Sequence, residues 1–282
     1  MFVSTTAVAL VVLSGCSNEQ VRELKALGLP EAASSSADHI FPLWIGSWIA
    51  AGVIGVFVWG LMVWAVIRYR KRGDEVPTQI RYHLPLEVLY TVVPFVVIFV
   101  LFYHTVVTQN DVLNEENPDY QVVVVGQQWS WSFNHLGEDG LDATGAPASE
   151  TNDVHVVGTP ADAPELVLPV DRRVQFTLRS QDVIHSFWIP AFYFKMDVVP
   201  GRENSWVTTP TEEGEFTGKC AELCGLYHSR MLFTVRVVSQ AEYDAYIEEL
   251  RARGDTGAVF GKSDVDTVAG LESEGENGGS GE

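Results

Sequence analysis

Two long apolar segments in the first part of this chain constrain its fold more than any other feature. The segment from Ile40 to Ile67 contains no charged side chain, and about 20 apolar residues are enough for a helix to cross a bilayer. A second segment, from Leu84 to Val107, contains Glu87 as its only charged residue. A buried core helix is the alternative for one such segment, but two of this length favour transmembrane helices at about residues 42–67 and 84–107.

The loop between the two apolar segments is basic. Four cationic side chains follow the first segment almost directly: Arg68, Arg70, Lys71 and Arg72. Cytoplasmic loops of membrane proteins carry an excess of Lys and Arg. We therefore expect a multi-pass protein of the cell membrane, in which both ends of the helical hairpin at 40–110, and all later residues, lie on the extracytoplasmic side.

Residues 1–16 resemble an export signal. An apolar run leads into Leu13-Ser14-Gly15-Cys16, which is similar to a lipobox, the pattern in which the cysteine becomes the lipidated first residue of the mature protein. The first six residues lack the Lys or Arg that normally opens such a signal, so an unprocessed segment is the alternative. We expect cleavage and lipidation at Cys16, followed by a polar tether at 17–39.

Charge is divided unevenly along the 282 residues. Residues 1–110 contain seven acidic and seven basic side chains, so residues 111–282 carry the whole net charge of −19. A segment this acidic repels phosphate backbones, which excludes nucleic acid as a partner. It also predicts a halophile as the source, because salt screens the self-repulsion of a highly charged fold.

Short β segments replace the apolar runs beyond residue 110. Six runs rich in β-branched and aromatic residues alternate with clusters of Pro, Gly and Asp, as in β-sandwiches and barrels: Tyr120–Val125, Val154–Val157, Leu166–Val170, Val174–Leu178, Ile184–Ile189 and Met231–Val238. A helix is predicted over Gln240–Arg253. The composition of residues 254–282, rich in Gly, Glu and Ser, predicts a disordered acidic tail.

The segment from Cys220 to Met231 brings thiolate, imidazole and thioether groups together within twelve residues. Its candidate ligands are Cys220, Cys224, His228 and Met231. Thiolate and thioether donors select copper, and imidazole also binds it. A structural zinc site is one alternative, although zinc rarely recruits a thioether. A Cys220–Cys224 disulfide is another, since Cys16 is the only further cysteine.

His185 is the candidate for a ligand from outside this loop. A single His beside apolar residues is more often a core or surface residue. Here, however, a His on an earlier β segment precedes a Cys/His/Met loop, which is the ligand order of cupredoxins. Two thiolates in place of one allow two coppers bridged by both sulfurs. We therefore predict an N-terminal two-helix transmembrane hairpin followed by an all-β cupredoxin-like sandwich or barrel at 111–253, which includes the terminal helix.

The chain resembles subunit II of the haem–copper oxidases, of the cytochrome c oxidase type, over about residues 40–245. The string Cys-x-Glu-x-Cys-x-x-x-His-x-x-Met matches that family's dinuclear copper loop, CuA. The resemblance implies six copper ligands: Cys220 and Cys224 as bridges, His185 and His228 on one copper each, and Met231 and the Glu222 carbonyl as weak outer ligands. It also implies that the Glu222 carboxylate helps to bind magnesium at the boundary with subunit I, a solvated loop carboxylate being the alternative.

Two further segments are similar to parts of the same family. Gln127-Gln128-Trp129-Ser130-Trp131 resembles its aromatic strand, which implies that Trp129 receives electrons from the donor. Two Trp at i and i+2 share a face of a strand, so we assign Trp131 to the core. The segment Leu86–Pro94 resembles the start of the second helix, where Glu87 would mark the entrance of a proton channel into subunit I. The alternative for Glu87 is a side chain that only reaches the membrane interface.

The resemblance implies an electron-transfer subunit. It would accept electrons from an external carrier, either cytochrome c or a small blue-copper protein, and pass them to haem in subunit I. There oxygen is reduced to water and protons are pumped, in a complex with the other oxidase subunits. A CuA subunit of a nitric oxide reductase is one alternative, and a membrane-anchored copper chaperone is another. A chaperone of this kind has a thioredoxin-like fold with its His after the Cys pair, whereas His185 precedes Cys220.

Overall fold

The computed structural model describes residues 26–74, 76, 78–113, 117–137, 153–257 and 259. They form two compact units. The first contains the described residues up to 113 together with Ala191–Phe194, and the second contains the others from Asn117 onward. The predicted signal with Cys16 lies outside the described residues, as do residues 260–282 of the predicted tail.

Two helices long and apolar enough to cross a membrane dominate the first unit: α3 (Ser35–Arg68) and α4 (Leu84–Leu113). Their exposed side chains are largely apolar, with Val56 77% and Trp59 70% exposed, as suits a lipid surrounding. At 1.5 Å per residue, α3 is about 50 Å long, whereas a bilayer core is about 30 Å thick. The helix therefore extends beyond the apolar segment from which it was predicted.

Part of the predicted tether is built into the first unit. The Ala33 amide donates to the Ala191 carbonyl at 2.9 Å, and the Ser34 hydroxyl donates to the Phe192 carbonyl at 3.0 Å. The Tyr193 hydroxyl donates to the Pro30 carbonyl at 2.6 Å. Residues 30–34 are therefore not a free linker, because they form hydrogen bonds with residues 191–193, which are distant in sequence.

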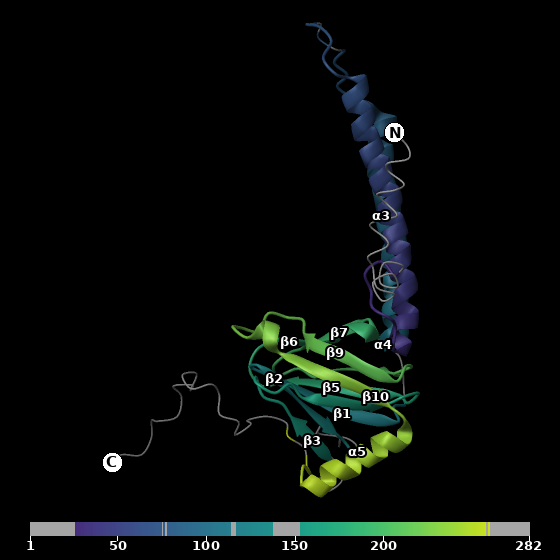
Figure 1. The fold of residues 1–282 in the computed structure, drawn as a ribbon. Helices are drawn as coiled ribbons and strands as arrows, with labels where there is room; N and C mark the ends of the chain where they lie inside the picture. Colours follow the sequence, from purple (N-terminus) through teal and green to yellow (C-terminus); the bar gives the residue numbers. More distant parts are fainter. Residues whose placement is uncertain are drawn as a thin grey trace, which may run out of the picture. The chain divides into compact units, whose positions relative to one another are not determined.

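The second unit is a sandwich of two five-stranded sheets (Figure 1). The first sheet has the order β3-β2-β1-β5-β8 and contains β1 (Tyr120–Gln127), β2 (Ser130–His135), β3 (Val154–Val157), β5 (Val174–Ser180) and β8 (Asn204–Thr208). The second has the order β4-β10-β9-β6-β7 and contains β4 (Glu165–Pro169), β6 (His185–Ile189), β7 (Phe194–Val198), β9 (Gly214–Cys220) and β10 (Leu232–Val238). The predicted fold class, a helical hairpin with a β-sandwich, is confirmed.

Aromatic side chains fill the space between the sheets. Phe187 of β6 stacks on Phe233 of β10, with ring centroids 4.8 Å apart and planes at 7°. Trp131 of β2 packs edge-on against both rings, and all three side chains are buried. Trp131 is thus a core residue, as its sequence position predicts, and β6 is held rigidly by its own aromatic side chain.

Helix α5 (Gln240–Arg253) covers the edge strands β3 and β4 and spans the predicted residues. It begins with a capping box, in which the Ser239 side chain accepts from the Glu242 amide and the Glu242 carboxylate accepts from the Ser239 amide. It ends at Gly254, whose φ of 84° lies in the left-handed region that favours glycine. Local side-chain and backbone contacts therefore define both ends of the helix.

The chain continues in an ordered form for several residues after α5. Thr256 forms a β-bridge with Val154 of β3, and the Gly257 amide donates to the Asp153 carbonyl at 2.9 Å. The prediction of disorder from residue 254 is wrong for these residues. Their backbone forms hydrogen bonds with unpaired backbone groups at the edge strand β3, and composition alone does not predict such pairing.

Candidate metal centre

Neighbouring strands bring the predicted ligands together. His185 is the first residue of β6 and Cys220 is the last of β9, and these strands pair antiparallel with Phe187 opposite Cys220. The Ala221 amide donates to the Ser186 carbonyl at 2.9 Å, which continues the pairing up to His185. The remaining ligands follow in the loop between β9 and β10, which contains a short 3-10 turn, η2 (His228–Arg230).

The donor atoms form a continuous series around the two sulfurs. His185 Nδ1 lies 3.9 Å from Cys220 Sγ, which lies 3.8 Å from Cys224 Sγ. On the other side, Cys224 Sγ lies 3.6 Å from His228 Nδ1. The order imidazole, thiol, thiol, imidazole therefore gives each end of the sulfur pair one nitrogen ligand.

The separation of the two sulfurs suits a shared metal and not a disulfide. A disulfide bond is about 2.05 Å long, whereas Cys220 Sγ and Cys224 Sγ are 3.8 Å apart and both cysteines are free. A metal about 2.3 Å from each sulfur, a typical metal–thiolate distance, would see them at an angle of about 110°. Both sulfurs can therefore bind the same ion, and can bridge two ions.

Met231 and the backbone of Glu222 supply weaker donors. Met231 Sδ is fully buried and lies 3.7 Å from Cys224 Sγ. The Glu222 carbonyl lies 3.2 Å from Cys220 Sγ, while its side chain is exposed. A thioether aimed at a thiolate pair is unusual for zinc and typical of copper sites, so the donor set fits copper best.

The two thiols differ in acidity. Burial works to raise the pKa of Cys220, but the hydrogen bond with His185 and those with the backbone of Glu222 and Ser186 hold it below its ordinary value. Burial, followed by the charge of Cys220, raises the pKa of Cys224. Cys220 therefore loses its proton more readily than Cys224, and the thiolate is the form in which a cysteine binds a metal.

Asp182 is a residue of the site that the sequence did not reveal. Its Oδ1 accepts from His185 Nε2 at 2.8 Å. Burial of Asp182 works to raise its carboxyl pKa, but hydrogen bonds from His185, Val183 and Gln128 hold that pKa below its ordinary value. Asp182 is therefore a carboxylate that contacts Nε2 of His185, a predicted metal ligand. Its position three residues before His185 was the only available signal.

Two glycines make room around the ligands. A Cβ on Gly126 of β1 would lie 3.1 Å from Cδ2 of His185. A Cβ on Gly225, between Cys224 and His228, would lie 3.0 Å from Gln128 Nε2 and 3.0 Å from Trp129 Nε1. Gly225 also has a φ of +133°, so both its backbone and its surroundings require the absence of a side chain.

The structure corrects the expected setting of Trp129. Gln128 and Trp129 form the turn between β1 and β2, so Trp129 and Trp131 do not share the face of one strand. Trp129 is only 6% exposed, and its ring lies beside Gly225 of the metal loop. The turn therefore carries Trp129 toward the metal ligands and not into the core.

Glu87, which the resemblance places at the entrance of a proton channel, belongs to the start of helix α4. It lies in the first turn of α4, where its Oε1 accepts from the His83 amide at 2.9 Å. His83 Nδ1 in turn accepts from the Leu86 amide at 3.3 Å. This reciprocal contact gives the Glu87 carboxylate a structural role at the N-terminal end of α4.

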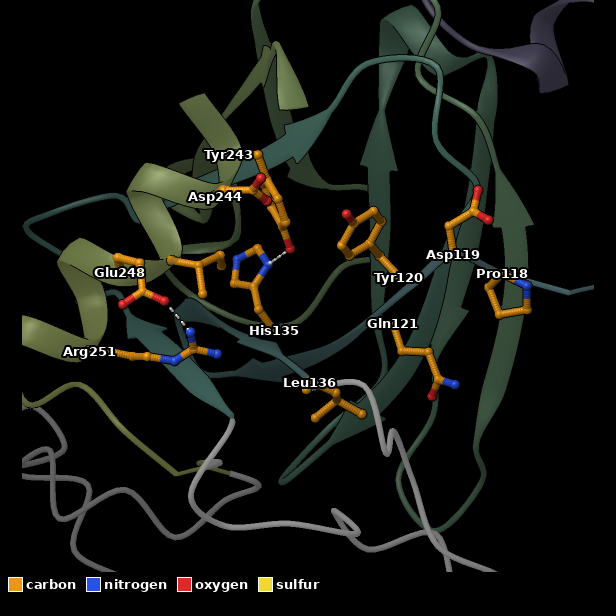
Figure 2. Close-up of a pocket in the computed structure, with 12 residues that line it drawn as sticks. Pro118, Asp119, Tyr120, Gln121, His135, Leu136, Tyr243, Asp244, Glu248 and Arg251 are labelled. Atoms are coloured by element: carbon orange, nitrogen blue, oxygen red, sulfur yellow. Dashed lines mark hydrogen bonds and ion pairs between the residues drawn. The ribbon is translucent and has the colours of Figure 1, made fainter. Parts of the chain in front are cut away.

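A separate cavity of about 370 Å³ lies between α5 and the strands β1 and β2 (Figure 2). His135 lies beside it, with Nδ1 3.1 Å from the Tyr243 hydroxyl, and Glu248 and Arg251 form an ion pair on the helix side. None of the predicted copper ligands lines this cavity. The predicted copper ligands lie instead at the start of β6, at the end of β9 and in the loop between β9 and β10.

Comparisons with known families cover both units. The profile described as the transmembrane domain of cytochrome c oxidase subunit II matches residues 23–105, and the one described as its periplasmic domain matches residues 120–238. The two matches together include α3, most of α4 and every strand of the sandwich.

Individual relatives agree with the family profiles. A probable cytochrome c oxidase subunit 2 of Streptomyces coelicolor is 42% identical and spans 90% of this chain and 88% of its own length. A cytochrome c oxidase subunit 2 of Mycobacterium tuberculosis is 37% identical, over 88% of this chain and 80% of its own. The crystal structure of the periplasmic domain of subunit II of cytochrome oxidase from Bradyrhizobium japonicum covers 49% of this chain and 97% of that chain, at 27% identity and a TM-score of 0.41.

Proposed function

The chain belongs to the cytochrome c oxidase subunit II family, and on this premise we propose that it holds a dinuclear copper centre that receives electrons for the oxidase. The observation that carries the proposal is the series of donor atoms from His185 through Cys220 and Cys224 to His228, each within 4 Å of the next. When bound there, a copper pair supplies a one-electron carrier.

Each ligand has a distinct role in this proposal. Cys220 and Cys224 would hold both ions through their thiolates, and the 3.8 Å between their sulfurs supports a shared role. His185, which lies beside Cys220, and His228, which lies beside Cys224, would each supply one imidazole nitrogen. Met231 and the Glu222 carbonyl act as weak outer ligands that tune the potential more than they hold the metal.

Trp129 is proposed as the residue at which electrons enter. Its indole packs against the metal loop at Gly225, and its burial keeps water away from the path between donor and metal. The donor is cytochrome c or a small blue-copper protein. The acidity of residues 111–282 would favour a basic donor at low salt, whereas molar salt, with a Debye length of about 3 Å, would screen that attraction.

The membrane partner is subunit I, which carries the haem. An open hollow beside Cys220 and His228, lined also by Trp188, Lys195 and Lys219, supports docking on this side of the centre. The exposed Glu222 carboxylate is available to bind magnesium at that boundary. Glu87 is proposed at the entrance of the proton channel in subunit I, in addition to its role at the start of α4.

Lipidation at Cys16 and a halophilic source are further proposals that rest on the sequence alone. Cys16 follows the lipobox-like residues 13–15, and the net charge of −19 suits a high-salt habitat. Mass spectrometry of the purified subunit tests lipidation directly, since a diacylglycerol group on an N-terminal Cys16 changes both its mass and its first residue.

Low-temperature EPR of the purified oxidase tests the proposed function. We expect a delocalised mixed-valence copper signal that is lost in Cys220→Ser. The matched variant Cys16→Ser should keep the signal, because α3 and α4 anchor the chain without a lipid. A single-copper blue spectrum, or a Cys220–Cys224 disulfide without copper, would overturn the proposal.

A further inference from the structure

The turn that carries Trp129 is tied to the metal loop by the residue beside it. The Gln128 side chain donates from Nε2 to the Cys224 carbonyl at 2.7 Å. The two residues are 96 positions apart in the chain, so this contact joins the β1–β2 turn to the loop that follows β9. The absence of a side chain at Gly225 leaves the space that Gln128 Nε2 occupies.

The backbone of Gln128 makes a second contact, with the other side of the site. Its amide donates to Asp182 Oδ2 at 2.6 Å, while Asp182 Oδ1 accepts from the Val183 amide at 2.6 Å and from His185 Nε2 at 2.8 Å. Both carboxylate oxygens of Asp182 are therefore engaged. One of them is shared between the backbone and the ring of a metal ligand.

The contact between Asp182 and His185 selects the nitrogen that meets the metal. An imidazole that donates from Nε2 keeps its lone pair on Nδ1, and Nδ1 is the atom that faces Cys220 Sγ at 3.9 Å. A hydrogen bond on the outer nitrogen of a ligating His commonly sets its tautomer and orientation. Asp182 thus fixes the tautomer and orientation of the His185 ring, and the Gln128 amide fixes the position of the Asp182 carboxylate.

We propose that Gln128 and Asp182 form one positioning unit. This unit sets the distance from the Trp129 turn to Cys224 on one side of the metal site and to His185 on the other. The Gln128 side chain contacts Cys224 directly, whereas the Gln128 backbone contacts His185 through Asp182. This inference rests on the proposed copper function. It adds that the copper environment and its coupling to Trp129 depend on two residues that do not bind metal.

Two variants of the assembled oxidase test the unit. Gln128→Leu removes the side-chain donor at similar size, and Asp182→Asn removes the charge that accepts from His185. Gln121→Leu is the matched control, since Gln121 lies near the opposite end of β1, about 20 Å away at 3.3 Å per residue. The measurements are the copper EPR spectrum, the midpoint potential and the rate of copper loss to the chelator bicinchoninate.

We expect both variants to assemble with copper but to show altered EPR hyperfine splittings and a shifted midpoint potential. Loss of such an outer contact typically weakens metal binding or activity by 10- to 100-fold, so copper loss should accelerate about tenfold. Gln121→Leu should match the unaltered oxidase. If the residues act as one unit, Gln128→Leu combined with Asp182→Asn should be no more severe than the worse single variant.

Three results would overturn the inference. One is an unaltered EPR spectrum, potential and chelation rate in both variants. Another is an equal change in Gln121→Leu, which would indicate a general loss of stability. The third is full additivity in the double variant. Failure of the proposed copper function would look different, because the unaltered oxidase itself would then lack the mixed-valence signal.

Discussion

The indole of Trp129 lies edge-on against the ring of Tyr227, with centroids 4.9 Å apart and planes at 88°. Tyr227 directly precedes His228, a proposed copper ligand, and is more exposed than Trp129. The Arg230 guanidinium lies 5.8 Å from the same tyrosine ring. The buried tryptophan and the metal loop are thus in direct aromatic contact. An edge-to-face pair of this kind contributes about 1 kcal/mol to stability.

Replacing Trp129 should slow electron delivery without disturbing the copper. In Trp129→Leu, we expect reduction of the copper by reduced mitochondrial cytochrome c, measured by stopped flow, to slow about tenfold or more, since small losses of positioning are costly in rate. Trp129→Phe keeps an aromatic edge at Tyr227 and should recover part of the rate. Unchanged kinetics with an unchanged EPR spectrum would remove Trp129 from the electron path.

Gly225→Ala should disturb the contact between the turn and the loop. The new Cβ would lie 3.0 Å from atoms of both Gln128 and Trp129, at a φ of +133°. We expect a loss of about 1–3 kcal/mol in unfolding free energy and a changed copper EPR spectrum. Gly214→Ala is the control, because Gly214 also has a positive φ, of +153°, but its Cβ would meet nothing closer than 3.6 Å. Equal EPR changes in both variants would contradict the steric argument.

Met231→Leu should retain copper but change its potential. Met231 is fully buried with Sδ 3.7 Å from Cys224 Sγ, and a Leu of similar volume usually costs less than about 1.5 kcal/mol in stability. Redox titration of the EPR signal measures the shift, with Met196→Leu on β7 as the control. Complete loss of copper from Met231→Leu would show that the thioether is a primary ligand.

Acid should destabilise the sandwich through His135. Burial lowers the pKa of this residue to about 4, whereas an unfolded chain binds the proton near pH 6.5. Between these values the unfolded state binds more protons, so stability is lost as the pH falls from about 6.5 toward 4. The maximum loss is about 3 kcal/mol.

Unfolding of the solubilised subunit between pH 7 and pH 4 measures this effect. In His135→Gln the amide can still bond the Tyr243 hydroxyl, which lies 3.1 Å from His135 Nδ1 (Figure 2), but it cannot titrate. The variant should therefore lose less stability than the unaltered chain over this range. Parallel pH profiles for the two proteins would exclude His135 as the cause.

Several parts of the fold and site are visible in the residues themselves. The loop from Cys220 to Met231 predicts copper because its donor types suit few other metals. The ends of α5 are signalled by Ser239, Glu242 and Gly254, whose side chains or backbone act locally. The strands β2, β7, β8 and β9 were not among the six predicted β segments, because Ser, Lys, Asp, Asn and Gly interrupt their apolar pattern and their pairing depends on other strands.

The sequence by itself determined two apolar spans, an acidic β domain and a set of candidate copper donors. Each of these depends on composition or on residues close together along the chain. Only the tertiary structure decided that Trp129 lies in a turn against the metal loop and that Gln128 and Asp182 join that turn to Cys224 and His185. The reason is physical: these hydrogen bonds join residues 54 and 96 positions apart, and only the pairing of the strands brings their donors and acceptors within reach.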